Sequence, residues 1–229
     1  MVAALVIALS LAMANRTGLG APWLQGRLPK QDLPNWLRSG LALTVLLLLV
    51  GFPLSLIANL GVDPAAYPFG WELLGASFKA GVVEEIVYRF FLVSLFVWLG
   101  RFFKRDAEGR PAPGVYWSAI LIGGLLFGWA HVDARLANPG GTFESFALIM
   151  LLNSGLGIYF GWLFWKLGLE WAMLAHLIYD VFISMAVIPV YLMKSPIAWL
   201  VLLAGLAIAS VISWRFLTQD QQDAGLHKV

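Results

Sequence analysis

Long runs of apolar residues dominate the chain, and short polar segments separate them. Several runs approach the roughly 20 residues that an α-helix needs to cross about 30 Å of hydrocarbon. The pattern predicts helices at residues 2–14, 41–60, 71–99, 115–132, 146–165, 171–193 and 197–216. The predicted fold class is therefore all-α: a polytopic transmembrane helical bundle of about seven spans, with a range of six to eight.

Composition supports this assignment and excludes an ordinary soluble domain. Hydrophobic residues make up 60% of the 229 residues and charged residues 12%, with a mean hydropathy of +0.81. Soluble domains average about 25% charged residues. A net charge of +2 gives no reason to expect nucleic acid, so the lipid bilayer is the expected partner. With no cysteine, any catalysis must use His, Asp, Glu or Ser. We expect one integral membrane domain over residues 1–229.

The basic residues predict an orientation in the membrane. One set of loops carries Arg16, Arg27, Lys30, Arg38, Arg101, Lys104, Arg105, Arg110, Lys166, Arg215 and Lys228, and the opposite set carries Arg135 and Lys194. By the positive-inside rule, the loop at residues 101–110 and the C-terminus face the cytoplasm and the N-terminus lies outside. The expected location is a bacterial inner membrane. The first apolar run is short enough for a secretory signal, but it lacks a basic start.

The third predicted helix contains charged residues that a membrane span rarely tolerates. It carries Lys79, Glu84, Glu85 and Arg89, and each charge costs about 2.5–3.5 kcal/mol at the bilayer centre. Glu85 and Arg89 are four residues apart and can form an ion pair, whereas Glu84 lies on the adjacent stripe of the helix. An ion-paired packing cluster and a functional polar site both fit these residues.

Two histidines lie within later spans, each with a neighbour one helical turn away. Phe127 precedes His131 by four residues, and Asp180 follows His176 by four. A desolvated glutamate beside a histidine can hold a water molecule and take its proton, which is the chemistry of hydrolysis. His131, His176 and one of the two glutamates could equally hold zinc. The sequence lacks the His-Glu-x-x-His motif of zincins, but both interpretations remain open.

The expected depths of the two histidines differ. His131 lies near the outer end of its span and His176 about six residues from the inner end of its own. The two can meet if residues 133–142 dip into the bundle, or if residues 167–170 lie inside the protein as the break in a helix. We favour the second arrangement. Glycine pairs spaced by four, Gly124 with Gly128 and Gly157 with Gly161, predict close helix packing.

Three short motifs occur in order on successive hydrophobic spans: EEIVYR at residues 84–89, FGWAH at 127–131 and HLIYD at 176–180. Together they resemble the motif set of the type II CAAX prenyl protease and bacteriocin-processing family of intramembrane endopeptidases. The resemblance covers residues 71–190, which would form the catalytic core. The N-terminal third and the last helix add only general membrane character.

The resemblance implies roles for the motif residues. Glu84 and His131 would bind and activate the attacking water, while His176 and Asp180 would line the oxyanion side. Prenyl-protease members have Asn where this chain has Asp180. Because an ionised Asp only accepts hydrogen bonds, Asp180 either stays protonated or orients His176.

Supporting roles fall to Glu85, Arg89 and Phe127, with Arg89 either holding Glu85 or reaching a substrate carboxylate. We favour a glutamate mechanism with no cofactor. The alternative is a divalent metal such as zinc on Glu84, His131 and His176.

The predicted function is an intramembrane endopeptidase, a hydrolase that cleaves a peptide or protein at a membrane-adjacent site. One alternative is a non-catalytic immunity or scaffold protein of the same family. A small transporter or proton-coupled channel could use the same ionisable residues as a relay, but the chain lacks the half-to-half symmetry typical of transporters.

Overall fold

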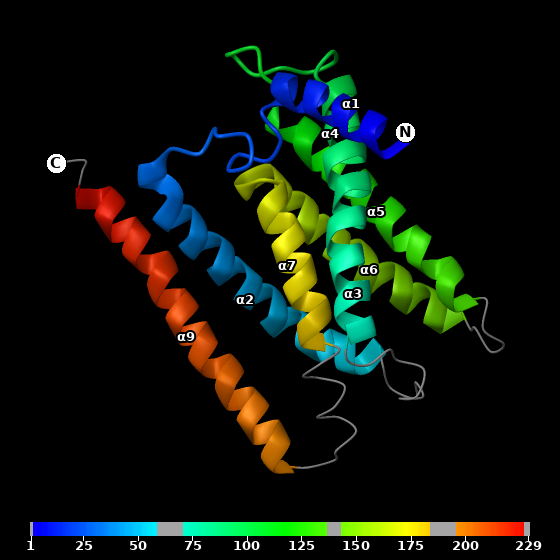
Figure 1. Ribbon diagram of the computed structural model, residues 1–229, viewed down its shortest axis with the longest axis vertical. Helices are drawn as coiled ribbons and strands as arrows, with labels where there is room; N and C mark the ends of the chain where they lie inside the picture. The colour runs from blue at the N-terminus through cyan, green and yellow to red at the C-terminus, as the bar shows by residue number, and fades with distance from the viewer. Residues whose placement is uncertain (1, 59–70, 137–142, 184–195, 227–229) are drawn as a thin grey trace. The chain divides into compact units, whose positions relative to one another are not determined.

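The computed structural model describes residues 2–58, 71–136, 143–183 and 196–226. Within these ranges the regular structure is helical and no strand is present, which confirms the all-α prediction (Figure 1). An isolated bridge joins Arg105 and Pro111 in the polar loop. Each of the seven predicted helices has a counterpart in the structure.

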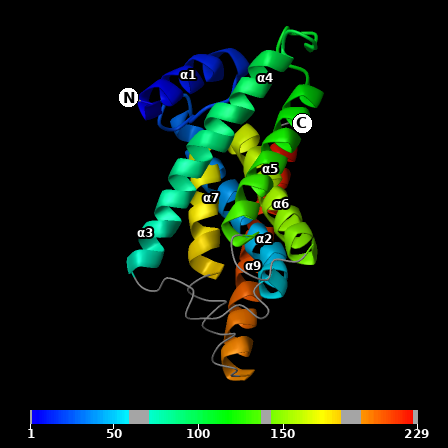
Figure 2. The same ribbon diagram turned by 90° about the vertical axis from the view of Figure 1, so that its right-hand side faces the viewer.

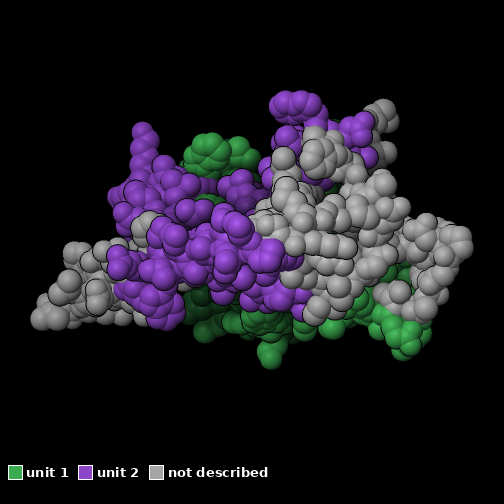
Figure 3. All heavy atoms as spheres, turned by 90° about the horizontal axis from the view of Figure 1, so that it is seen from below, with its two compact units in different colours: residues 1–27, 80–173 green, residues 28–79, 174–229 purple. Residues whose placement is uncertain are grey.

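The chain divides into two compact units, coloured in Figure 3. Unit 1 comprises residues 1–27 and 80–173, and unit 2 comprises residues 28–79 and 174–229. Unit 1 contains α1 (Val2–Thr17), η3 (Ala80–Glu84), η4 (Ile86–Val93), α4 (Ser94–Gly100), α5 (Pro113–Leu136), α6 (Phe143–Leu167) and the start of α7 (Leu169–Phe182). Unit 2 contains η1 (Lys30–Asp32), α2 (Leu33–Ala58), α3 (Trp71–Lys79), the rest of α7 and α9 (Pro196–Leu226).

Three helical stretches are long and apolar enough to cross a membrane: Lys30–Leu54, Pro113–Val132 and Phe146–Leu167. Two shorter apolar helices cover Ala3–Thr17 and Trp199–Arg215. The boundaries differ from expectation mainly at α2, which begins at Leu33, before its apolar run, and at α9, which continues to Leu226, beyond its apolar run. The last residues of the predicted helix at 171–193 lie outside the described part of the chain.

The third predicted helix is continuous from α3 to α4, but its middle is π-helical. The π segments η3 and η4 together span Ala80–Val93, interrupted at Glu85. A π-helix pairs each residue with the one five positions away, and such segments are rare and concentrate at functional sites. The charged residues Glu84, Glu85 and Arg89 all lie in or between these wide turns.

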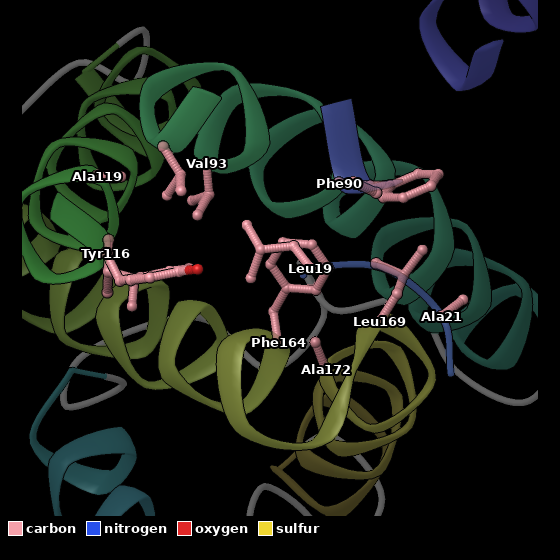
Figure 4. Close-up of a cluster of buried hydrophobic side chains, with 12 residues drawn as sticks. Leu19, Ala21, Phe90, Val93, Tyr116, Ala119, Phe164, Leu169 and Ala172 are labelled. Carbon is pink, nitrogen blue, oxygen red and sulfur yellow. The ribbon is translucent and has the colours of Figure 1, made fainter. Parts of the chain in front are cut away.

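An apolar cluster forms the core of unit 1 at the end where α4 and α5 meet the segment after α1 (Figure 4). Its members include Leu19, Phe90, Val93, Ala119 and Phe164. Tyr116 takes part through its ring, which stacks on Trp165 with 4.8 Å between ring centres. Its hydroxyl donates a hydrogen bond to the Thr17 carbonyl at 2.6 Å, so the chain leaving α1 is fixed to α5.

The junction between α6 and α7 lies beneath this same N-terminal segment. Gly168 separates the two helices with a φ of +99°, and a side chain there would clash with Pro22. The Leu169 amide donates to the Gly20 carbonyl at 2.9 Å, and one Glu170 carboxylate oxygen accepts from the amides of Trp23 and Leu24. Residues 167–170 therefore form a helix break that the protein covers. Residues 133–142 are the other segment that could let His131 and His176 meet, and positions 137–142 of it lie outside the described residues.

Helices α5 and α6 lie side by side in both ribbon views (Figures 1 and 2). Their closest approach is at the predicted glycines: a Cβ added to Gly157 would lie 2.9 Å from the Gly124 Cα and 3.1 Å from the Phe127 Cβ. Real Cβ atoms are essentially never so close to backbone. The glycines thus permit a contact that any side chain would prevent.

Substituting Gly157 by alanine should therefore lower the thermal unfolding temperature of the purified protein in detergent. Overpacking of this kind costs about 1–3 kcal/mol, which corresponds to about 2–4 °C per kcal/mol in a chain of this size. Gly155→Ala is the matched control, because nothing lies within 4 Å of a Cβ added there. Circular dichroism measures the unfolding temperature of each variant. Equal temperatures for the two would contradict the close approach of α5 and α6.

Candidate active site

A buried ion pair lies in the π-helical part of the long helix. Arg89 Nη1 is 3.0 Å from Glu85 Oε1, and the two side chains are 1% and 0% exposed. Their spacing of four residues brings them to one face, as the sequence predicted. Breaking a buried pair by removing one partner leaves an uncompensated charge, which costs about 3–5 kcal/mol. The pair is therefore a strong local constraint.

Arg89 also connects three helices of unit 1. Its Nη2 donates a hydrogen bond to the Gly157 carbonyl of α6 at 3.1 Å. The guanidinium carbon lies 4.3 Å from the centre of the Phe127 ring of α5 and 5.4 Å from that of Phe160. Cations are attracted to the faces of aromatic rings at such distances. The positive charge thus holds η4, α5 and α6 together.

Phe127 in turn orients His131, one turn further along α5. The Phe127 carbonyl is 2.7 Å from His131 Nδ1, and the two ring centres are 4.4 Å apart. Because a carbonyl oxygen can only accept, Nδ1 must carry the hydrogen and donate it. In the neutral imidazole this leaves Nε2 as an unprotonated acceptor.

Nε2 of His131 faces the carboxylate of Glu84. The distance from His131 Nε2 to Glu84 Oε2 is 3.8 Å, and the side chains are 33% and 31% exposed. This separation exceeds a direct hydrogen bond. Glu84 Oε2 is nevertheless buried and accepts no hydrogen bond from any residue within the described ranges. An acceptor oxygen and an acceptor nitrogen therefore face each other across a gap.

The third motif forms a local pair in unit 2. His176 Nε2 lies 3.6 Å from Asp180 Oδ2, with His176 6% and Asp180 28% exposed. The two residues are four apart on α7, on the same face of the helix. The structure therefore brings together residues within each motif, and Glu84 with His131. That His176 and Asp180 complete the same site stays a prediction.

Glu84 and His131 are also candidate ligands for a metal ion. A catalytic zinc site has three protein ligands and an open position. In the described part of the chain, no three His, Asp or Glu side chains form a group that could hold a metal ion. Unit 1 contributes Glu84 and His131 as a pair of possible ligands. The set of Glu84, His131 and His176 stays a prediction.

Two partners of Arg89 were not anticipated from the sequence. The Gly157 carbonyl has no sequence signal, because every residue has one. Phe160 lies on the same face of α6 as Gly157 and Phe164, within an apolar run whose pattern does not distinguish packing from contact with a cation.

Replacing Arg89 by methionine should destabilise the protein by about 3–5 kcal/mol, because Glu85 would remain buried without its counter-charge. The measurement is the thermal unfolding temperature and the yield of folded protein in detergent. The double variant Glu85→Gln with Arg89→Met removes both charges and should recover part of the loss. A single variant as stable as the native chain would show that the pair is not a constraint on the fold.

Comparison with known families gives the site its context. A family model for the type II CAAX prenyl endopeptidase Rce1-like family matches residues 66–182. No curated protein and no solved structure matches the chain. The matched region covers just over half of the chain and contains all three motifs, from Glu84 to Asp180. This membrane protein therefore belongs to the type II CAAX prenyl endopeptidase Rce1-like family, a family of proteases.

Proposed function

We propose that the protein is an intramembrane endopeptidase in which Glu84 and His131 activate the water that cleaves a peptide bond. One observation supports this most directly: Glu84 Oε2 lies 3.8 Å from His131 Nε2, is buried and receives no hydrogen bond from a described residue. A water molecule held between the two atoms can donate one hydrogen to each. The substrate would be a membrane-associated peptide or protein cut near the membrane.

The proposed reaction begins when Glu84 takes a proton from this water as general base. The resulting hydroxide attacks the carbonyl carbon of the peptide bond and forms a tetrahedral adduct. Glu84 then gives the proton to the leaving nitrogen, the C–N bond breaks, and an acid and an amine are released. His131 positions the water through Nε2, because its Nδ1 hydrogen is engaged by the Phe127 carbonyl.

The adduct places negative charge on the former carbonyl oxygen, which requires a donor. In this proposal His176 supplies it, and Asp180 orients the imidazole from 3.6 Å away. An ionised Asp180 would also favour the protonated imidazole, which donates more strongly.

A metal could supply part of the same chemistry, by lowering the pKa of a bound water and polarising the carbonyl. Its ligands would be Glu84, His131 and His176. We favour the mechanism without metal, since the Glu84 oxygen can act as a base alone.

A non-catalytic immunity or scaffold role is the alternative. It is less favoured because packing explains Glu85, which is fully buried and paired with Arg89, but not Glu84, which is 31% exposed beside His131. A partly exposed carboxylate inside a membrane span is costly for a purely structural element.

The near-isosteric variant Glu84→Gln should abolish proteolysis, because an amide cannot take the proton from water. The test compares protein N- and C-termini in membranes of cells that express the native chain or the variant at equal folded abundance. We expect specific termini to vanish with Glu84→Gln, and these would identify the substrates. Glu108→Gln makes the same chemical change in the exposed polar loop and should leave the termini unaltered.

The protease proposal is contradicted if the termini are unchanged in Glu84→Gln and both forms rescue a deletion phenotype. That result would support the immunity or scaffold role. Repeating the assay with purified protein after chelation separates the two mechanisms. Activity that survives chelation supports the glutamate mechanism, whereas activity restored only by added zinc supports the metal.

We further propose a bacterial inner membrane location, with the loop at residues 101–110 in the cytoplasm and the N-terminus outside. Because the chain has no cysteine, single cysteines report the topology cleanly. In intact cells, a membrane-impermeant maleimide should label Lys194→Cys but not Glu108→Cys, which should react only after permeabilisation. The reverse pattern would contradict the orientation.

A further inference from the structure

Tyr88 is a polar residue that none of the assigned roles uses. It lies in η4, four residues after Glu84, so that the two side chains share a face of the helix. Side chains on a helix lean toward its N-terminus, which directs the Tyr88 ring over the turn that carries Glu84. The two groups are close enough to interact electrostatically.

The ring of Tyr88 is held against the same wall as His131. It packs at right angles to the Phe127 ring, with 5.1 Å between the centres. His131 packs against that ring as well, at 4.4 Å. Phe127 is itself fully buried beneath the Arg89 guanidinium. Tyr88 and His131 thus pack against one fixed aromatic side chain, and Glu84 lies 3.8 Å from His131.

The hydroxyl of Tyr88 makes no hydrogen bond with any residue in the described ranges, and the side chain is only partly buried. Tyr116, which lies near the start of α5, does have a hydrogen-bond partner: its hydroxyl donates to the Thr17 carbonyl at 2.6 Å. Packing against Phe127 needs the ring alone, so a phenylalanine would suffice for it. The extra hydroxyl is a donor on a ring that packs against the same phenylalanine as His131.

We propose that the Tyr88 hydroxyl donates a hydrogen bond to the carbonyl oxygen of the scissile bond, and so is a catalytic residue contributed by unit 1. This inference rests on the proposed protease activity and adds a donor to it. The phenol keeps its proton throughout; the hydrogen bond strengthens as negative charge develops on the substrate oxygen. A phenol keeps its proton at neutral pH and can donate a hydrogen bond there, whereas an ionised carboxylate can only accept one.

The test uses the full-length protein in detergent and a synthetic peptide that spans a cleavage site found in the Glu84→Gln comparison. Removing one oxyanion donor lowers kcat on the order of 10²-fold. Tyr88→Phe should therefore reduce kcat by about that factor, with KM and the thermal unfolding temperature nearly unchanged. Tyr116→Phe, the matched control, should lower the unfolding temperature and keep kcat.

The possible outcomes distinguish the role of Tyr88 from the proposed protease activity on which it rests. If the native chain cleaves, Glu84→Gln does not, and Tyr88→Phe retains native kcat, the activity stands and the role of Tyr88 is wrong. A loss of kcat that matches a loss of folded protein also overturns it, because a packing role explains that result. If the native chain shows no Glu84-dependent cleavage, both proposals fail.

Discussion

The ion pair of Glu85 and Arg89 is the constraint on which the arrangement of unit 1 depends. Two opposite charges with almost no exposure must satisfy each other, and they also need further polar contacts to offset the loss of water. Arg89 obtains these from the Gly157 carbonyl and the Phe127 ring. The first contact requires α6 to come close, which only glycine at positions 124 and 157 permits. The charge pair and the glycine contact therefore depend on each other.

This constraint reaches the candidate site through Phe127. Its ring lies under Arg89, and its carbonyl binds Nδ1 of His131, so the position of the guanidinium is linked to the tautomer of the imidazole. The result is a preorganised acceptor nitrogen next to Glu84.

The sequence predicted the helices well because most of the apolar runs are long and few polar residues interrupt them. The pairing of Glu85 with Arg89 and of His131 with Phe127 followed from spacing along one helix. Contacts between helices were harder to predict. That Glu84 approaches His131 rested on a resemblance, and no pattern signals the carbonyl of Gly157 as an acceptor. The π-helical turns were also missed, since apolar periodicity does not separate them from an α-helix.

Glu84 and Glu85 are neighbours in the chain with opposite environments. Successive residues on a helix point in different directions, so one carboxylate enters the packed interior while the other faces the gap beside His131. The buried one is paired with Arg89 at 3.0 Å. The other faces His131 rather than an arginine and is 31% exposed. When two neighbouring acids have such different surroundings, one can have a structural role and the other a chemical role. The adjacency then has a consequence: the residue that anchors the helix fixes the direction of the one that faces His131.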